Sequence, residues 1–597
     1  MQKKDFPKIS TIAIFVYWSK RNSVENNVLT YVTELLKVAD TVLFVSNSPL
    51  ASGEIQHVTE LGAIFHQREN RGFDFWGWKE GIKLLENKIK KASNLILCNS
   101  SCYLAFPDRL DPLLQSLNDD ADMWGISCFG ENSNNFHLQS YFLMFKENLL
   151  NDWDFFIHFW TQLPEMPKWE DAVRLGEGEI TRYFSKRFRC KSLINSTNLP
   201  STDIDPSIYY PVNLLMHGSP FLKKKIFLAD YSIYLDKSDG SVPSSSMNYI
   251  REKKGNYEEI LSDLIVRISP TKLINSLHLN YLIGQNRGKI INDPKVAVIC
   301  FVYYEDMVNH MVDILRKFEG LGDIYLISSK KEILSSYQSL LSKYKINAIY
   351  RLQENRGRNE AAYFLTCKDV WLNYEYVCAL HDKKSLHVKP ALLGRDFMKH
   401  CEQNLCPSRN SIEEIIEIFE NNSLLGLLVP PFPFFGSFTL SIFHPLGQNK
   451  ISINNLNDKL FFGKLFSSSD ELDISSAPFG GMFWARTKAL ISLPNSALAL
   501  SDFPKEPLKQ PDGTILHAIE RCYPMVTRLN GFYTARIINI NRLPLIYDNI
   551  TYFTFFLSCK SKLLFTFKIL MKKILSNHPR AKRIVKYIYR YIKLDNF

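Results

Sequence analysis

Short, fully apolar runs rich in β-branched residues recur along the chain, and each is followed by a stretch with helical spacing. The first run covers 12–17 and reads Ile-Ala-Ile-Phe-Val-Tyr, and a similar run covers 296–303. Uninterrupted apolar runs of this length are typical of central strands in a parallel sheet, because helices cover both faces of such a sheet. Helical patterns follow at about 24–38 and 306–319. The pattern therefore predicts strands that alternate with helices, as in βαβ units.

A four-residue motif, Glu-Asn-Arg-Gly, occurs twice. It covers Glu69–Gly72 and Glu354–Gly357, an offset of 285 residues. In both copies an apolar strand leads into the motif, and a helix and a further strand follow, at 95–98 and 376–380. The repeated order of elements indicates two related α/β domains.

The repeat predicts two domains, each with a doubly wound parallel sheet (Rossmann-type), at 8–230 and 294–548. The segment between them, 231–293, opens with a stretch rich in Ser, Asp, Gly and Pro that is typical of a linker. It continues with helical spacing, so we expect a partly helical connector. Residues 549–597 form a separate tail.

The charge of the chain is concentrated at its C-terminal end. The whole sequence holds 72 Lys and Arg against 61 Asp and Glu, a net charge of +11. Residues 560–597 hold eleven basic residues and one acidic residue, a net of +10, which leaves +1 for the rest. A body without an excess field of either sign argues against a nucleic-acid-binding protein.

The tail has the pattern of a basic amphipathic helix. Its basic residues and its apolar residues repeat at spacings of three and four on adjoining faces, for example Arg583, Lys586, Arg590 and Lys593 beside Ile584, Ile588 and Tyr591. Such a helix can lie on an anionic bilayer. The alternatives are a helix that packs on the body with its basic face in solvent and, more weakly, binding to nucleic acid. We expect 560–597 to contact a membrane surface.

The eleven cysteines contain no Cys-x-x-Cys pair, which favours free thiols in a reducing cytoplasm. The uncharged run 424–443 contains three prolines, which favours a buried strand and a loop over a membrane-spanning helix. No signal peptide is predicted from the N-terminal residues.

Ligands of open α/β sheets bind beyond the carboxyl ends of the strands, where both copies of the motif are expected. The ordered set of motifs resembles the rhamnan synthesis protein F family of rhamnosyltransferases, with GT-A-like domains. The segments that carry the resemblance are Ser46–Pro49, Glu69–Phe75, Trp76–Lys79, Cys98–Ser101, Trp124–Ile126, His137–Phe142, Glu354–Gly357, Leu380–Ser385, Pro430–Pro431, Gly481–Arg486 and Asp512–Thr514.

The resemblance implies an inverting glycosyltransferase that uses a nucleotide sugar, with dTDP-rhamnose as the expected donor. The implied acceptor is a lipid-linked glycan in the synthesis of cell-surface polysaccharide or O-antigen. The expected location is cytoplasmic and peripheral, at the inner face of the cell membrane, and other polysaccharide-synthesis enzymes are further candidate partners. The alternative is that one or both modules are non-catalytic, and bind glycan or act as a scaffold of an assembly complex.

The resemblance also implies donor-binding residues at the strand ends of both domains. They are Asn70, Arg71, Gly72, Asp74, Asn99 and Ser101 in the first, and Asn355, Arg356, Gly357, His381, Asp382, Lys383 and Lys384 in the second. GT-A enzymes usually hold Mg²⁺ or Mn²⁺ at an Asp-x-Asp motif, and neither domain has one. Asp382 could hold a single ion; alternatively, Lys383 and Lys384 could neutralise the diphosphate without a metal.

An inverting transfer needs a general base for the acceptor hydroxyl. Counting forward from the segment that resembles an acceptor loop, the expected base is Glu177 in the first domain, with Glu179 as a competitor, and Asp512 in the second. The alternative role of Asp512 is to cap the helix that begins near Ile515.

Overall fold

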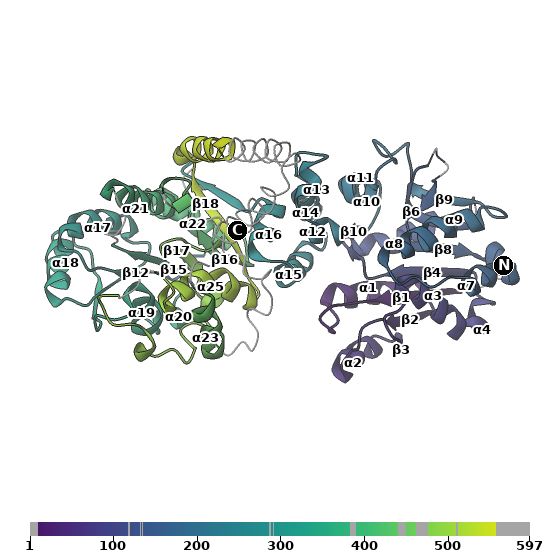
Figure 1. Ribbon diagram of the computed structural model, residues 1–597, viewed down its shortest axis with the longest axis horizontal. Helices are drawn as coiled ribbons and strands as arrows, with labels where there is room; N and C mark the ends of the chain where they lie inside the picture. The colour runs from purple at the N-terminus through teal and green to yellow at the C-terminus, as the bar shows by residue number, and fades with distance from the viewer. Residues whose placement is uncertain are drawn as a thin grey trace, which may run out of the picture. The chain divides into compact units, whose positions relative to one another are not determined.

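The chain folds into two compact units. In the computed structural model, the described residues are 10–117, 120–131, 133, 135–285, 288–290, 292–382, 390–436, 438–439, 449–460, 476–508 and 512–556 (Figure 1). The first unit contains residues 1–268 and 275–277, and the second contains 269–274 and 278–597. Each unit is built on its own large sheet.

The sheet of the first unit has the strand order β3-β2-β1-β4-β8-β6-β7, and β9 pairs with β6. The strands are β1 Thr11–Tyr17, β2 Thr41–Ser46, β3 Ile64–Gln67, β4 Asn94–Asn99, β6 Met123–Phe129, β7 His137–Leu138, β8 Phe142–Lys146 and β9 Cys190–Ile194. β1 to β4 are parallel, and β8 runs antiparallel to both β4 and β6. A separate antiparallel pair joins β5 Cys102–Leu104 to β10 Phe221–Lys223.

Alternate residues of β1 face two different cores, one on each side of the sheet. Phe15 and its neighbours at every second position pack with α1, Asn26–Val38, and Ile14 packs with α3, Phe73–Leu84. Helix α3 lies close to the strand because Gly81 has no side chain: a Cβ there would be 2.7 Å from Ile14. Burial of both faces explains the uninterrupted apolar runs.

The first unit contains further helices besides α1 and α3. They are α2 Ser52–Glu60, α4 Glu86–Ile89, α5 Leu110–Ser116, α6 Glu147–Asn151, α7 Trp153–Thr161, α8 Trp169–Asp171, α9 Gly178–Phe184, α10 Pro206–Tyr209, α11 Pro211–Met216, α12 Lys225–Leu228, α13 Ser232–Leu235, α14 Val242–Glu252 and α15 Tyr257–Arg267. A π-helical turn, Ala172–Glu177, leads directly into α9. Helices α14 and α15, which lie in the expected connector, belong to the first unit.

The second unit has the strand order β11-β18-β16-β17-β15-β12-β13-β14. The strands are β11 Asn280–Ile283, β12 Val296–Phe301, β13 Asp323–Ser328, β14 Ile349–Leu352, β15 Tyr376–His381, β16 Leu425–Val429, β17 Phe483–Arg486 and β18 Tyr533–Asn539. The helices are α17 Val308–Leu315, α18 Lys331–Lys343, α19 Arg358–Ala361, α20 Val370–Asn373, α21 Ala391–Leu405, α22 Arg409–Glu420, α23 Lys450–Leu460, α24 Thr487–Leu490 and α25 Ile515–Leu529, with a last helix at 543–556; α16, Pro270–Leu277, precedes β11.

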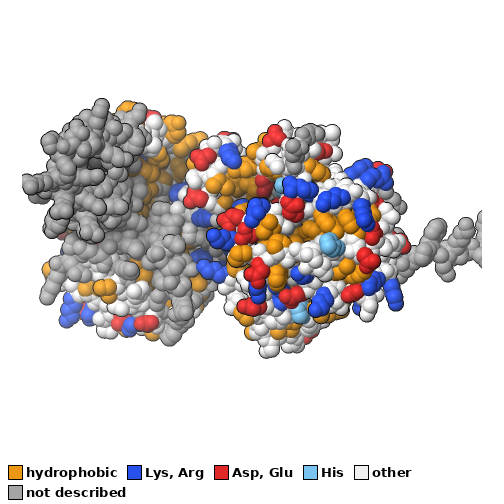
Figure 2. Space-filling model, turned by 45° about the vertical axis from the view of Figure 1, so that its right-hand side comes forward, with side chains coloured by type: hydrophobic (Ala, Val, Ile, Leu, Met, Phe, Trp, Pro, Cys, Tyr) orange, Lys and Arg blue, Asp and Glu red, His pale blue; other side chains and the backbone are white. Residues whose placement is uncertain are grey.

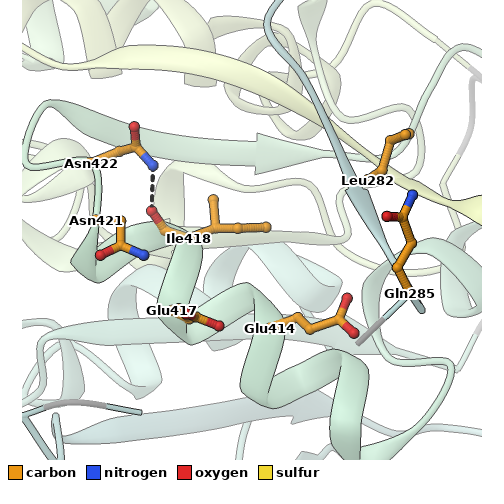
Figure 3. Close-up of a pocket in the computed structure, with 7 residues that line it drawn as sticks. All are labelled: Leu282, Gln285, Glu414, Glu417, Ile418, Asn421 and Asn422. Atoms are coloured by element: carbon orange, nitrogen blue, oxygen red, sulfur yellow. Dashed lines mark hydrogen bonds between the residues drawn. The ribbon is translucent and has the colours of Figure 1, made fainter. Parts of the chain in front are cut away.

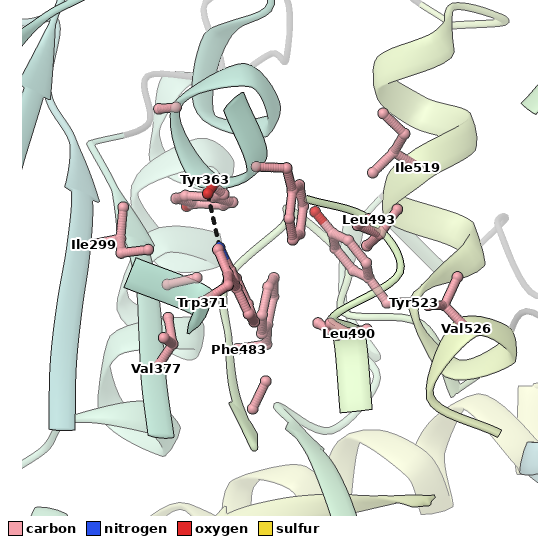
Figure 4. Packing of buried hydrophobic residues seen from close by; sticks show 14 of the residues in the cluster. Ile299, Tyr363, Trp371, Val377, Phe483, Leu490, Leu493, Ile519, Tyr523 and Val526 are labelled. Atoms are coloured by element: carbon pink, nitrogen blue, oxygen red, sulfur yellow. Dashed lines mark hydrogen bonds between the residues drawn. The ribbon is translucent and has the colours of Figure 1, made fainter. Parts of the chain in front are cut away.

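A dense aromatic core packs one face of this second sheet (Figure 4). The rings of Phe483 and Tyr523 lie 4.7 Å apart between centroids, so β17 and α25 meet there. Trp371 is fully buried and donates its indole N–H to the Tyr363 carbonyl at 2.8 Å, which satisfies the one polar group that it carries into the core.

The two sheets share one arrangement of central strands. β12 to β15 match β1 to β4, β17 matches the antiparallel β8, and β16 and β18 match β6 and β9. The predicted α/β fold class is confirmed. The antiparallel strand makes each sheet mixed, and an apolar run alone cannot reveal the direction in which a buried strand runs.

Among the residues that the structure describes, no helix is long and apolar enough to cross a bilayer, and the ten cysteines are free thiols, as predicted. Basic and acidic side chains are interspersed over the face of the first unit shown in Figure 2, in keeping with a body of small net charge. The basic tail at 560–597 lies outside the described residues.

Candidate functional site

Both copies of the Glu-Asn-Arg-Gly motif form the same turn between the third strand and the next helix. Gly72 has φ +71° and Gly357 has φ +77°, which is the left-handed region that favours glycine. A Cβ would lie 2.2 Å from Trp76 at the first position and 2.4 Å from Ala361 at the second. Both glycines are therefore required for the turn itself.

The other motif residues lie toward the surface. Arg71 forms an ion pair with Glu165, and Arg356 donates to the backbone carbonyls of the 501–503 turn, at 2.5 Å to Phe503 O. Asn70 and Asn355 are exposed. The arginines thus bind neighbouring segments of their own units, and a role in donor binding remains a prediction for them.

At the strand ends of the first unit, three predicted residues meet. The Asn99 amide donates to Asp74 Oδ2 at 2.9 Å, and its carbonyl oxygen accepts from Ser101 N at 3.0 Å and Oγ at 2.5 Å. Burial raises the pKa of Asp74 to about 7, against the lowering influence of Lys223, Arg68 and Asn99. A carboxyl group that titrates near neutral pH therefore lies at the end of β4.

Lys223 joins this group from β10. β10 pairs with β5, and β5 follows β4 closely in the sequence. In this pairing Lys223 lies opposite Cys102. Burial lowers the pKa of Lys223, but the carboxylates of Asp205, Glu177 and Asp74 outweigh it and raise the pKa above the usual value. The lysine therefore stays positively charged. Lys223 was not predicted from the sequence, because only the pairing of two distant strands brings it to this site.

Glu177 also lies beside these strand ends. Its Oε2 accepts from Ser140 N at 2.8 Å and from Ser140 Oγ at 2.5 Å, and its Oε1 is 3.8 Å from His137 Nε2. Ser140 shortly precedes β8, whose first residue pairs with the end of β4. The competitor Glu179 forms an ion pair with Arg182 at 2.5 Å on the same helix. Of the two carboxylates, Glu177 is the one in contact with the strand-end loop.

In the second unit, Asp382 follows β15 and is 4 % exposed. Its Oδ2 accepts from the backbone N–H groups of Tyr303 and Tyr304, both at 2.8 Å. In the first unit, Ser100 Oγ accepts from Trp18 N at 3.2 Å in the matching place. Asp382 and Ser100 are thus counterparts.

His381 and the two lysines complete the set predicted at this strand end. His381 Nε2 lies 2.5 Å from the Gly480 carbonyl oxygen, so this nitrogen carries the proton and donates. Lys383 and Lys384 lie outside the described residues.

Glu520 of α25 is the counterpart of Glu177. Its Oε1 accepts from Gly480 N at 2.9 Å, in the same way that Glu177 accepts from Ser140 N. Glu177 and Glu520 each stand 13 residues before the last parallel strand of their sheet, β9 or β18. Glu520 was not predicted, because the spacing was counted forward from the loop. The spacing of 13 residues before this strand is the signal in the sequence that points to it.

Asp512 has different surroundings. It accepts from Asn449 Nδ2 at 2.7 Å and lies 3.5 Å from Arg521 Nη2. Thr514 occupies the N-cap position of α25 and makes no side-chain capping hydrogen bond, so Asp512 is not the N-cap residue of this helix. Its catalytic role remains a prediction.

The buried carboxylate of Glu360 lies near Glu520. It is 2 % exposed, accepts from Asn359 Nδ2 at 2.9 Å and also accepts from the Tyr523 hydroxyl. A Cβ on Gly481 would be 2.8 Å from Asn359 Nδ2, so these groups adjoin the Gly480–Gly481 loop. Asn359 occupies the position of Asp74.

The described residues do not form a metal site of their own. No group of three His, Cys, Asp or Glu side chains that could hold an ion occurs among them. Asp382 is the carboxylate at the expected place, and one of its oxygens already accepts from two amides. The described residues therefore do not by themselves surround an ion, and the single-ion role of Asp382 remains a prediction.

A pocket between β11 and α22 is lined by Leu282, Gln285, Glu414, Glu417, Ile418, Asn421 and Asn422 (Figure 3). Its carboxylates accept from the backbone of the segment after β11: Glu414 from Gly284 N at 2.6 Å and Glu417 from Lys289 N at 3.0 Å. These bonds attach that segment to the helix, so we interpret the pocket as structural.

The chain is similar to proteins of two bacterial species. The chain is 26% identical over 182 residues to the uncharacterized protein y4gN of Sinorhizobium fredii, covering 30% of the chain and 46% of that protein. It is 29% identical over 244 residues to the uncharacterized protein WxcX of Xanthomonas campestris pv. campestris, covering 40% of the chain and 32% of that protein. The chain thus spans less than half the length of these relatives.

Among solved structures, similar chains include a glycosyltransferase involved in glycosylation of the major capsid of PBCV-1 and the glycosyltransferase GlyE of Streptococcus pneumoniae TIGR4. The first has a TM-score of 0.20 and 10% identity, covering 36% of this chain and 92% of that chain. The second has a TM-score of 0.23 and 9% identity, covering 66% and 90%.

Residues 42–531 match the family described as rhamnan synthesis protein F. The match includes both copies of the glycine motif, both strand-end clusters and both Glu177 and Glu520. The chain therefore belongs to the rhamnan synthesis protein F family.

Proposed function

We propose that this chain is an inverting glycosyltransferase that moves a sugar from a nucleotide sugar to an acceptor hydroxyl at the carboxyl ends of the sheet strands. The observation that carries the proposal is the repeated carboxylate: Glu177 accepts from Ser140 N, and Glu520 accepts from Gly480 N. Membership of the rhamnan synthesis protein F family supports the same reaction.

The carboxylate would act as the general base. A backbone N–H that donates to a carboxylate fixes its orientation, and a positioned base contributes about 10²–10⁴-fold to a rate. The base takes the proton of the acceptor hydroxyl while the hydroxyl oxygen forms a bond to the anomeric carbon. The bond from that carbon to the diphosphate breaks on the opposite face, so the configuration inverts.

The diphosphate leaves with negative charge that a cation can stabilise. In the first unit Lys223 supplies that charge, since its pKa is raised by Asp205 and Glu177. In the second unit this role is proposed for Lys383 and Lys384. Mg²⁺ or Mn²⁺ bound by Asp382 together with the diphosphate is the alternative.

The finer identity of the substrates rests on the family description alone. We propose dTDP-rhamnose as the donor and a lipid-linked glycan as the acceptor, in the synthesis of cell-surface polysaccharide or O-antigen. We propose that the enzyme lies at the inner face of the cell membrane and that other enzymes of polysaccharide synthesis are its partners.

The test measures nucleotide release and sugar transfer with a panel of nucleotide sugars. Glu520→Gln and Glu177→Gln should each lower kcat of the unit concerned by about 100-fold or more, because the amide cannot take a proton. Glu179→Gln is the matched control and should retain activity. Full activity of the double variant Glu177→Gln, Glu520→Gln would eliminate both bases, and Asp512→Asn would then be examined.

A second candidate function concerns the first unit alone. Ser100 occupies the position of Asp382, so this strand end has an acidic residue in the second unit and a serine in the first. The first unit could then bind glycan without transferring it. Loss of all turnover in Glu520→Gln, with full turnover in Glu177→Gln, would favour this candidate.

A further inference from the structure

The last described helix, 543–556, exposes large apolar side chains (Figure 1, yellow). Tyr552 is 72%, Phe555 67% and Tyr547 66% exposed. Asp548 is the one charged residue in the helix. Solvent-exposed apolar groups gathered in one segment mark a site of interaction with a partner or a membrane.

The helix face opposite these exposed side chains packs on the second unit. Ile546 is buried, and the ring of Phe553 lies 6.0 Å from that of Phe434. These two residues are seven positions apart, which places them on one helix face. The exposed aromatic residues are therefore presented outward by a helix that packs on the protein.

Phe434 belongs to an aromatic cluster in the loop after β16. Its ring is 4.9 Å from that of Phe432, which in turn lies 4.9 Å from that of Phe479. Phe479 precedes Gly480, the residue that contacts His381 and Glu520. Aromatic contacts thus run without interruption from the exposed helix to the candidate site of the second unit.

We propose that helix 543–556 inserts its exposed aromatic face into the interface of an anionic lipid bilayer. Tyr and Phe on an amphipathic helix suit the boundary between headgroups and acyl chains. The chain that follows the helix supports a bilayer over a protein partner, because 560–597 holds eleven basic residues and one acidic residue. The same contact would bring a lipid-linked acceptor to the second unit, and this last clause rests on the proposed function.

The test is flotation of the full chain with vesicles of phosphatidylcholine and phosphatidylglycerol at high salt, where attraction of the basic tail is screened. The triple variant Tyr547→Ser, Tyr552→Ser, Phe555→Ser should bind about tenfold or more weakly, since it loses buried apolar area. The control is the double variant Leu352→Ser, Leu372→Ser. It removes two apolar side chains that lie elsewhere on the second unit and are 61% and 59% exposed. It should change binding by less than about twofold.

Unchanged binding of the triple variant overturns the proposal. So does a shift from dimer to monomer in size-exclusion chromatography without weaker vesicle binding, which would identify a second copy of the chain as the occupant. The single variant Tyr552→Ser provides a milder form, and it should show a smaller loss in the same direction. Because the assay contains neither donor nor acceptor, its outcome is independent of the proposed transferase activity.

Discussion

At the scale of single residues, the two strand-end clusters combine backbone requirements with charge. Gly72 and Gly357 are needed for their conformation, whereas Asp74, Lys223 and the two glutamates supply chemistry. Substitutions at the first kind of position should affect stability, and substitutions at the second kind should affect binding and catalysis. Substitution of Asp74 should affect stability as well, because its pKa is raised in the folded protein.

Gly72→Ala should be strongly destabilising. The new Cβ would lie 2.2 Å from Trp76 in a left-handed turn, so strain adds to the clash, and about 1–3 kcal/mol or more of unfolding free energy should be lost. Gly53→Ala is the matched control, because no atom lies within 4 Å of its Cβ. Denaturant unfolding measures both, and equal stability of the two variants would contradict the conformational argument.

The stability of the first unit should depend on pH through Asp74. Its folded pKa, about 7, is above its unfolded value, so the unfolded chain releases the proton first as pH rises. The contribution of Asp74 is thus most favourable below about pH 4 and is lost between about pH 4 and 7. Asp74→Asn should remove this dependence, because an amide does not titrate.

Melting temperatures across that pH range measure the effect. The control is Asp111→Asn, at a residue on α5 whose side chain is exposed. Parallel curves for the wild type and Asp74→Asn would contradict a raised pKa at Asp74.

At the scale of elements, pairing between distant segments assembles each site. β10 brings Lys223 beside β5. The π-helical turn before α9 brings Glu177, and α25 brings Glu520, to the loops before the antiparallel strands. Helix α22 has a supporting role: Glu414, Glu417 and Glu420 accept from the backbone N–H groups of Gly284, Lys289 and Asn292.

Glu414→Ala should loosen the segment after β11. The Gly284 amide then loses its hydrogen bond to a charged acceptor, and such a bond contributes about 1.5–3 kcal/mol. Hydrogen exchange of this amide should therefore become about 10- to 100-fold faster. Glu332→Ala, at an exposed position of α18, should leave this amide unchanged. Equal exchange in both variants would show that other contacts hold the segment.

At the scale of the whole molecule, a body of small net charge is joined to a cationic end. Deletion of 560–597 removes a net charge of +10 and should weaken binding to anionic vesicles by more than about tenfold at low salt. The remaining binding should be insensitive to salt, because it depends on the apolar face of helix 543–556. Flotation of the truncated chain at several salt concentrations tests this, and an unaltered salt dependence would exclude the tail as the electrostatic contact.

Much of this architecture follows from local patterns in the sequence. Apolar runs such as 12–17 predicted strands buried on both faces, and the repeated Glu-Asn-Arg-Gly predicted two turns that require glycine, because burial and backbone conformation are encoded by neighbouring residues. The sequence also shows directly that the net positive charge is concentrated in 560–597.

Only the tertiary structure decided which side chains meet. Lys223 joins Asp74 because β10 pairs with a strand that precedes it by more than a hundred residues. Glu520 corresponds to Glu177 because each accepts from the loop before the antiparallel strand and stands before a matching parallel strand. The aromatic contacts of Phe434 with Phe553 likewise join two distant segments. Periodicity reports whether a position is buried, whereas the partner of a buried position depends on long-range pairing of strands and helices, which no local pattern specifies.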